Sequence, residues 1–405
     1  MTAMAARQGA ARTLAAIPNL DALFNARVRQ GVTGALAAER GSVVFSSPPI
    51  GSWTVRFDTG RVRLLRGSVG RSRAVVSADA ATLSAVLEGR ISGVEAFLER
   101  GLTVRGDLAF ALQMDGAFDV GPRPPHHPTS KTVDALGVRS AYLEAGPADA
   151  PVVLLLHGLG ATNASLLPLV VDLARDHRVI APDFPGFGAS QAPLWRYTAA
   201  ELGRWLGEFM RVLDIDHADL VGNSLGGRVA IEAALVAPAT VGRLVLLCPS
   251  PAFLRGRQFV PLVRLLPPSG SVILPTLPHR LVVASIRTMF ADPDRLDDPW
   301  YDAAADEHRR VMADFRHRRA FYAAMREIYL EPPHGDHGFW PRLPLLRPPA
   351  LFVWGDRDRL VPWGFARHVI EAVPHSDSVV LEDCGHVPQF EHPDLTIQLI
   401  RDFLD

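Results

Sequence analysis

Residues 217–235 read HADLVGNSLGGRVAIEAAL and place a serine between glycines, at the junction of two contrasting patterns. An apolar, strand-like run (218–221) comes before the serine, and an alanine-rich, helix-like run (228–235) follows it. A serine on such a strand-to-helix turn is held in strained backbone geometry with its hydroxyl projecting from the sheet, and small glycines let the strand and the helix approach closely. The pattern therefore predicts Ser224 as a nucleophile.

Two later motifs contain the other groups that a serine nucleophile needs, namely a base and a carboxylate that orients the base. FVWGDRDRLVP contains two aspartates after an apolar run, and LEDCGHVPQFEHP contains a histidine. The order Ser…Asp…His is the one associated with α/β hydrolases. Residues 132–405 resemble the alpha/beta-hydrolase family. The resemblance implies that Asp358, rather than Asp356, is the orienting acid and that His386 is the general base and acid.

Two glycine-containing loops extend this resemblance. LLLHGLGATNAS (154–165) resembles the His-Gly-x-Gly loop of these hydrolases, which implies that the backbone N–H groups of Leu159 and Leu225 form an oxyanion hole. Such donors need no reorganisation when charge develops in the transition state. We interpret His157 as structural. DFPGFGAS (183–190) matches another loop of the family and is expected to pack near the site.

Short apolar runs alternate with helical stretches through the C-terminal part of the chain, as expected for strands covered on both faces of a parallel sheet. The six runs are 152–156, 179–182, 218–221, 244–248, 350–353 and 378–381. This alternation predicts an α/β fold with a doubly wound, mostly parallel sheet. A stretch from about 251 to 345 interrupts the rhythm and is interpreted as an inserted helical cap over the site.

The N-terminal part has a different pattern. GSWTVRFDTGRVRLL (51–65) alternates around a turn and predicts a hairpin with one buried side. Two short helices are expected over 80–87 and 91–98, followed by a further alternating stretch over 102–114. Together these elements predict a small α+β domain.

This module resembles the sterol-carrier-protein-2 family over residues 18–118. The resemblance rests on the tryptophan-bearing hairpin, the small helix that ends at Gly89, and the GLTVRGD segment. Members of that family enclose an apolar tunnel for fatty acyl chains, acyl-CoA or sterols, which implies a fatty acyl or sterol ligand here. Residues 1–17 are expected to form a tail or helix, and DVGPRPPHHPTSK (119–131) a proline-rich linker.

Composition limits the remaining function classes. A net charge of −1 offers no case for nucleic-acid binding, and two cysteines do not make a disulfide framework. No apolar run approaches the roughly 20 residues that span a bilayer, so we expect a cytoplasmic protein without a membrane span. No cofactor and no metal are expected, since no ligand set has convincing spacing. The oligomeric state stays open.

The leading hypothesis is a serine hydrolase that cleaves a carboxylic ester or thioester of a hydrophobic acyl substrate through an acyl-enzyme. An alternative keeps the fold but changes the reaction, because GNSLGG resembles carbon–carbon bond hydrolases and WGDRDRLVP resembles perhydrolases of the haloperoxidase type. HGLGATNAS departs from the Gly-Pro-Gly loop typical of the carbon–carbon hydrolases. A third hypothesis is a lipid carrier with a vestigial hydrolase domain.

Overall fold

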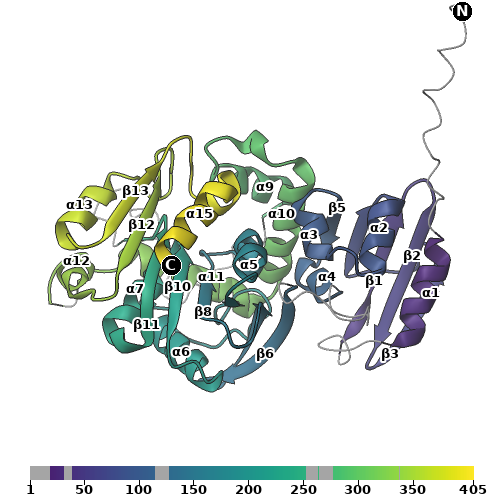
Figure 1. Cartoon of the computed structure of the whole chain (residues 1–405), viewed down its shortest axis with the longest axis horizontal. Coiled ribbons are helices and arrows are strands. Elements are labelled where there is room, and N and C mark those ends of the chain that lie inside the picture. Colours follow the sequence, from purple (N-terminus) through teal and green to yellow (C-terminus); the bar gives the residue numbers. More distant parts are fainter. Residues whose placement is uncertain (1–18, 32–38, 115–126, 252–262, 264–276, 337) are drawn as a thin grey trace, which may run out of the picture.

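The computed structural model describes residues 19–31, 39–114, 127–251, 263, 277–336 and 338–405. An N-terminal unit with a five-stranded sheet lies beside a larger unit with an eight-stranded sheet (Figure 1). The expected tail (1–17) lies outside the described residues, as do most of the linker and much of the first third of the expected cap.

The N-terminal sheet has the strand order β3-β2-β1-β4-β5. Only the β1–β4 pair is parallel. Its strands are β1 (Arg40–Ser47), β2 (Gly51–Asp58), β3 (Arg61–Arg66), β4 (Ala74–Ala78) and β5 (Leu102–Gly106). The helices are α1 (Leu20–Gln30), α2 (Ala80–Leu87), α3 (Gly93–Leu98) and α4 (Leu108–Met114). The expected hairpin is β2–β3, in which Trp53 lies opposite Arg66 and packs in the core against Phe24 of α1.

The expected continuous stretch over 102–114 is wrong, because the structure divides it into β5 and α4. Gly106 has a φ of +92°, a backbone conformation that cannot continue a strand. Asp107 then starts the helix, since its Oδ1 accepts a hydrogen bond from the Phe110 N–H at 2.9 Å. The apolar residues of this stretch therefore belong to two elements, β5 and α4, which both pack against the domain core.

The larger sheet has the order β13-β12-β11-β10-β8-β9-β7-β6, and it is parallel from β13 to β9. All six apolar runs predicted above lie in its parallel part. The strands are β6 (Thr129–Ala135), β7 (Val138–Ala145), β8 (Val152–Leu156), β9 (Arg178–Pro182), β10 (Ala218–Asn223), β11 (Val241–Leu247), β12 (Ala350–Gly355) and β13 (Asp377–Leu381). The fold class is therefore the doubly wound α/β fold expected from the sequence.

Helices cover both faces of this sheet. One face packs on α6 (Ala199–Val212), α7 (Leu225–Val236) and α13 (Phe365–Ala372). The other face packs on α5 (Leu167–Leu173) and α15 (Pro393–Leu404). Successive residues of β8 alternate between the two cores, with Leu154 and Leu156 in one and Val153 and Leu155 in the other. Burial on both faces explains why these strands are continuously apolar.

Between β11 and β12 the chain forms the helices α9 (His279–Arg287), α10 (Asp298–Ala313), α11 (Phe315–Leu330) and α12 (Phe339–Arg342). Short 3-10 turns are η2 (Asn163–Leu166), η3 (Pro238–Thr240), η4 (Pro293–Arg295) and η5 (Leu343–Leu345), and α14 spans Pro388–Glu391. Helix α10 lies against β5 and α4 of the N-terminal unit (Figure 1).

Ion pairs join α10 to β5. Arg105 pairs with Asp306 at 2.8 Å and with Asp302 at 3.1 Å, and the Gly106 N–H donates to Asp306 Oδ2 at 2.9 Å. The two units therefore share a specific polar interface.

Among the helices of the described residues, none is both long enough and apolar enough to cross a membrane.

Candidate active site

Ser224 lies on the turn between β10 and α7 with φ 55° and ψ −112°, outside the usual conformations of a non-glycine residue. Close packing of the strand and the helix imposes this geometry. A Cβ atom on Gly222 would lie 2.5 Å from the carbonyl carbon of Gly226, and one on Gly226 would lie 2.1 Å from the Leu156 carbonyl oxygen. Strain of this kind costs of order 1–3 kcal/mol and persists where the surroundings impose it.

His386 and Asp358 form a buried hydrogen-bonded pair, with 2.7 Å between His386 Nδ1 and Asp358 Oδ2. The other carboxylate oxygen, Oδ1, accepts the N–H groups of Leu360 at 2.8 Å and Val361 at 2.9 Å. These two bonds hold the carboxylate so that Oδ2 faces the imidazole. Asp356 points elsewhere, since its Oδ1 accepts the Cys384 N–H at 3.1 Å.

Asn223 connects the serine turn to the histidine loop. Its side-chain amide donates to the carbonyl oxygens of Leu247 and His386, each at 3.1 Å. Ser224 Oγ lies 3.4 Å from Ser250 Oγ, at the end of the neighbouring strand. Neither Asn223 nor Ser250 was predicted from the sequence, although Asn223 directly precedes Ser224.

Glu391 binds the backbone of the loop that carries His386, and it was not predicted from the sequence either. Its two oxygens accept the N–H groups of Gly385 and Ala291, each at 2.7 Å. Burial raises the pKa of this carboxyl group above its usual value. The His386 N–H adds a bond to the Met289 carbonyl oxygen at 2.7 Å, so the loop is fixed on both sides.

The loop after β8 packs directly on the serine turn, because a Cβ on Gly158 would lie 3.4 Å from the Ser224 Cβ. Leu159 follows in this loop, and Leu225 is the first residue of α7, where backbone N–H groups lack partners within the helix. Both predicted oxyanion donors therefore belong to segments that meet at Ser224.

His157 is a buried structural residue. Its Nε2 accepts the Phe184 N–H at 3.0 Å, which leaves the proton on Nδ1 to donate to the Gly158 carbonyl oxygen at 2.8 Å. Burial lowers the pKa of His157 to about 4, so the imidazole is neutral at physiological pH.

Asp183, in the DFPGFGAS loop, is completely enclosed. Its oxygens accept the N–H groups of Asn163 and Ala189, each at 2.8 Å. Burial nevertheless raises the pKa of Asp183 to about 7. Through Asn163, the carboxyl group fixes this loop against the segment 154–165, which also contains the predicted oxyanion donor Leu159.

Within the described residues, one group of three possible metal ligands lies within 4.8 Å, namely Cys248, Asp358 and His386. Its members have other partners, since Asp358 and His386 bind each other and the Cys248 thiol points at the Gly385 carbonyl oxygen at 3.6 Å. Burial raises the pKa of Cys248, which keeps the sulfur as a thiol rather than the thiolate that binds metals. The donor set therefore does not fit a metal ion.

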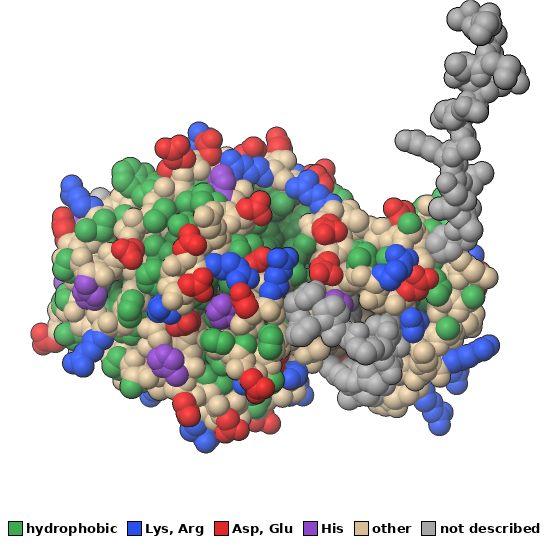
Figure 2. Space-filling view, viewed as in Figure 1, with side chains coloured by type: hydrophobic (Ala, Val, Ile, Leu, Met, Phe, Trp, Pro, Cys, Tyr) green, Lys and Arg blue, Asp and Glu red, His purple; other side chains and the backbone are tan. Residues whose placement is uncertain are grey.

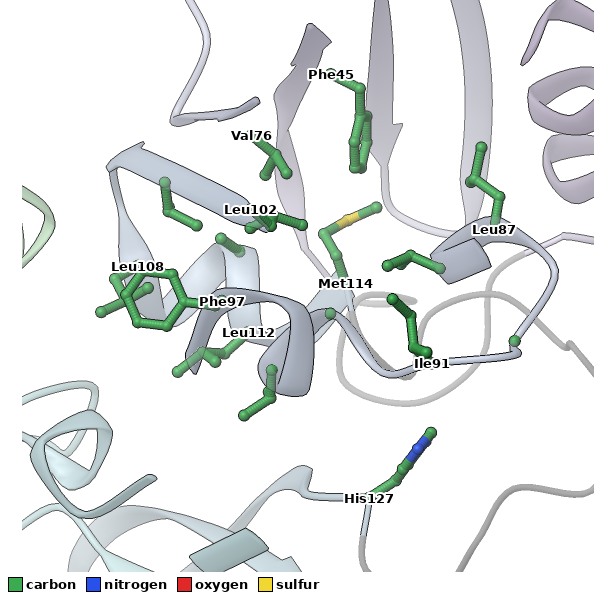
Figure 3. Close-up of a pocket in the computed structure, with 16 residues that line it drawn as sticks. Phe45, Val76, Leu87, Ile91, Phe97, Leu102, Leu108, Leu112, Met114 and His127 are labelled. Carbon is green, nitrogen blue, oxygen red and sulfur yellow. The ribbon is translucent and has the colours of Figure 1, made fainter. Parts of the chain in front are cut away.

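A separate apolar cavity of about 70 Å³ lies inside the N-terminal unit. Phe45, Val76, Phe97, Leu102 and Met114 are among its lining residues, and His127 lies at its lower end in the view of Figure 3. His127 is the one polar side chain among the described residues of the lining. The cavity suits an apolar chain, but it is smaller than the roughly 300–1,000 Å³ of typical small-molecule sites, so a long chain has to widen it.

Comparison with known proteins agrees with both units. A profile of the alpha/beta hydrolase family matches residues 153–399, and one of the SCP-2 sterol transfer family matches residues 32–119. A 2-hydroxy-6-oxononadienedioate/2-hydroxy-6-oxononatrienedioate hydrolase of Dechloromonas aromatica is 30% identical over 265 residues, which are 62% of this chain and 86% of that protein. A hydrolase of the same name from Paraburkholderia xenovorans is 29% identical over 66% of this chain and 91% of its own.

Solved structures show the same fold. A serine hydrolase involved in carbazole degradation is 26% identical with a TM-score of 0.56, covering 68% of this chain and 98% of its own. A bacterial membrane phospholipase A, 24% identical, covers 80% of this chain and 94% of its own with a TM-score of 0.60. The enzyme described here is therefore a hydrolase that belongs to the alpha/beta hydrolase family and carries an N-terminal domain of the SCP-2 sterol transfer family.

Proposed function

We propose that this hydrolase cleaves a carboxylic ester of a hydrophobic acyl group, with Ser224 as nucleophile, His386 as general base and acid, and Asp358 as orienting acid. One observation carries the proposal: a strained serine turn is tied through Asn223 to a histidine that is already paired with a buried carboxylate. A nucleophile, a base and a carboxylate that orients the base are the groups that an activated serine requires.

We propose the following path for the proton. Because His386 Nδ1 donates to Asp358, its Nε2 carries a free lone pair that accepts the Ser224 hydroxyl proton as Oγ attacks the ester carbonyl. The N–H groups of Leu159 and Leu225 are proposed to stabilise the oxyanion. His386 then protonates the leaving alcohol, and water, activated by the same imidazole, releases the acid from the acyl-enzyme.

The carbon–carbon bond hydrolase is the second candidate, favoured by the two relatives named for dienedioate substrates. A dioate carries two carboxylates, for which arginine is the usual partner. Arg228, four residues after Ser224, is engaged at 3.1 Å with Glu232 and at 3.0 Å with Glu331. Because Arg228 is already paired with two carboxylates, it is poorly placed to bind a carboxylate of the substrate. An uncharged ester does not need such a partner.

For the N-terminal domain we propose a fatty acyl or sterol ligand, held in the cavity of Figure 3. We also propose the boundaries 18–118 for this domain, 119–131 for the linker, and 132–405 for the hydrolase domain with its cap.

The experiment is a comparison of p-nitrophenyl esters with a ring-fission dioate, using purified protein and Ser224→Ala. We expect turnover of the esters, labelling of the wild type by a fluorophosphonate probe, and loss of both in the variant with an unchanged unfolding midpoint. Turnover of the dioate alone would establish the second candidate instead. Ester turnover that survives in Ser224→Ala would refute the assigned nucleophile.

A further inference from the structure

A groove of about 720 Å³ lies between the two domains. Its walls come from α3 and β5 of the N-terminal domain, and from α5, α10, α14 and α15 of the hydrolase domain. Figure 2 shows this hollow on the face where the two domains meet. Its volume lies within the roughly 300–1,000 Å³ of small-molecule sites, which are common at domain interfaces.

Half-buried apolar side chains from both domains line the groove. The N-terminal domain contributes Leu98, and the hydrolase domain contributes Val171, Trp300 and Ile397 from three separate helices. These side chains expose apolar surface to water. Binding of an apolar ligand would bury this surface and is therefore favourable.

The groove shares a wall with the lipid cavity. Phe97 and Leu102 line both spaces, so only side chains separate the apolar interior of the N-terminal domain from the floor of the groove. The cavity alone is too small for a long acyl chain, so such a chain would have to extend past Phe97 and Leu102 into the groove. The shared wall favours an acyl chain as the occupant.

The charge of the lining restricts the head group. Among the described residues of the lining, three are arginines, and Arg100 pairs with Asp297 at 3.3 Å. Six of these described residues are acidic: Glu95, Glu99, Asp172, Asp297, Glu391 and Asp394. Asp172 is paired with Arg401 at 2.7 Å, which leaves an acidic excess. An excess of acidic groups repels anionic head groups such as a free carboxylate or the phosphates of coenzyme A.

We propose that this groove binds the acyl chain of an uncharged, single-chain ester and serves as an antechamber between the lipid cavity and the hydrolase domain. The inference deepens the proposed ester hydrolysis and rests on it for the identity of the substrate. It assigns the substrate class as a neutral long-chain ester, such as a monoacylglycerol, rather than an acyl-CoA thioester.

The test is to fill the groove from α15. Ile397→Trp places a larger side chain on its floor, and Leu395→Trp is the matched control, because Leu395 is 44% exposed on the same helix and does not line the groove. Both variants and the wild type are assayed with p-nitrophenyl acetate and p-nitrophenyl dodecanoate. The unfolding midpoint checks folding.

We expect Ile397→Trp to raise KM for the dodecanoate about tenfold. This is the change expected if roughly two methylene groups of the acyl chain are no longer buried. Acetate turnover should stay unchanged, and Leu395→Trp should match the wild type with both esters. An unchanged KM for the dodecanoate, or an equal change in KM for both esters, would refute the proposal that the groove binds the acyl chain.

If the wild type hydrolyses neither ester, the proposed function fails while the groove remains testable by binding. A monoacylglycerol carrying a photoactivatable group on its chain should then label peptides from 95–103 and 389–397 in the full-length protein. Monolauroylglycerol, but not lauroyl-CoA, should compete with it. Labelling confined to other peptides, or equal competition by both lipids, refutes the proposal.

Discussion

Gly226→Ala tests whether the close packing beneath Ser224 determines the geometry of the site. The added Cβ would lie 2.1 Å from the Leu156 carbonyl oxygen and 2.5 Å from its carbon, both of them backbone atoms that cannot rotate away. Ordinary van der Waals contact begins at 3.4 Å, so α7 has to move from β8 by more than about 1 Å. The Leu225 N–H and the Ser224 turn move with it.

Overpacking of this kind costs about 1–3 kcal/mol of unfolding free energy. A displacement of about 1 Å in the reacting groups costs on the order of 10²-fold in rate. We therefore expect kcat for p-nitrophenyl acetate to fall about a hundredfold and the urea midpoint to decrease.

Gly207→Ala is the matched control, because Gly207 lies inside α6 and a Cβ there meets nothing within 4 Å. Alanine at such a position should leave kcat unchanged and stabilise the fold by about 0.4–1 kcal/mol. Wild-type kcat in Gly226→Ala would refute the reasoning, since the site would then not depend on this packing.

Three further predictions concern single residues. Asp358→Asn should lower kcat by about 10⁴-fold with KM nearly unchanged, because an amide favours the wrong tautomer of His386. A much smaller loss of kcat in steady-state assays would indicate that another acid orients His386. Glu391→Gln keeps one acceptor for two N–H groups, so urea unfolding should show a loss of about 1–3 kcal/mol together with a lower kcat. Because the folded pKa of His157 is about 4, below its ordinary 6.5, its contribution to stability is present above pH 6.5 and is lost as the pH falls toward 4. Unfolding at pH 7.5 and pH 5 should therefore show a loss of about 2 kcal/mol that His157→Asn does not share, and an equal loss in both proteins would contradict the prediction.

The strands and the serine turn could be predicted from sequence because their signals are local. Most apolar runs of the parallel sheet are buried on both faces, although Val380 in the edge strand β13 is 41% exposed. The glycines around Ser224 are required by close contacts of α7 with β10 and with the neighbouring strand β8. The division between β5 and α4 was missed because alternation cannot distinguish a strand from a short amphipathic helix, and only Gly106 marks the change.

Long-range contacts explain what the sequence could not predict. Asn223, Ser250 and Glu391 contribute through partners that become neighbours only after folding, so no spacing along the chain identifies them. The packing of α10 on β5 depends on two separate domains, and a charged helix gives no local indication of the partner of Asp306.

Asp306 of α10 also covers one end of an edge strand of the N-terminal sheet. β5 is an edge strand, and its Gly106 N–H is satisfied by a side chain of the hydrolase domain. The opposite edge, β3, carries Arg61, Arg63 and Arg66, the kind of charged side chains that discourage strand addition. Separating the two domains would uncover the less protected edge, so the N-terminal domain alone should self-associate through β5.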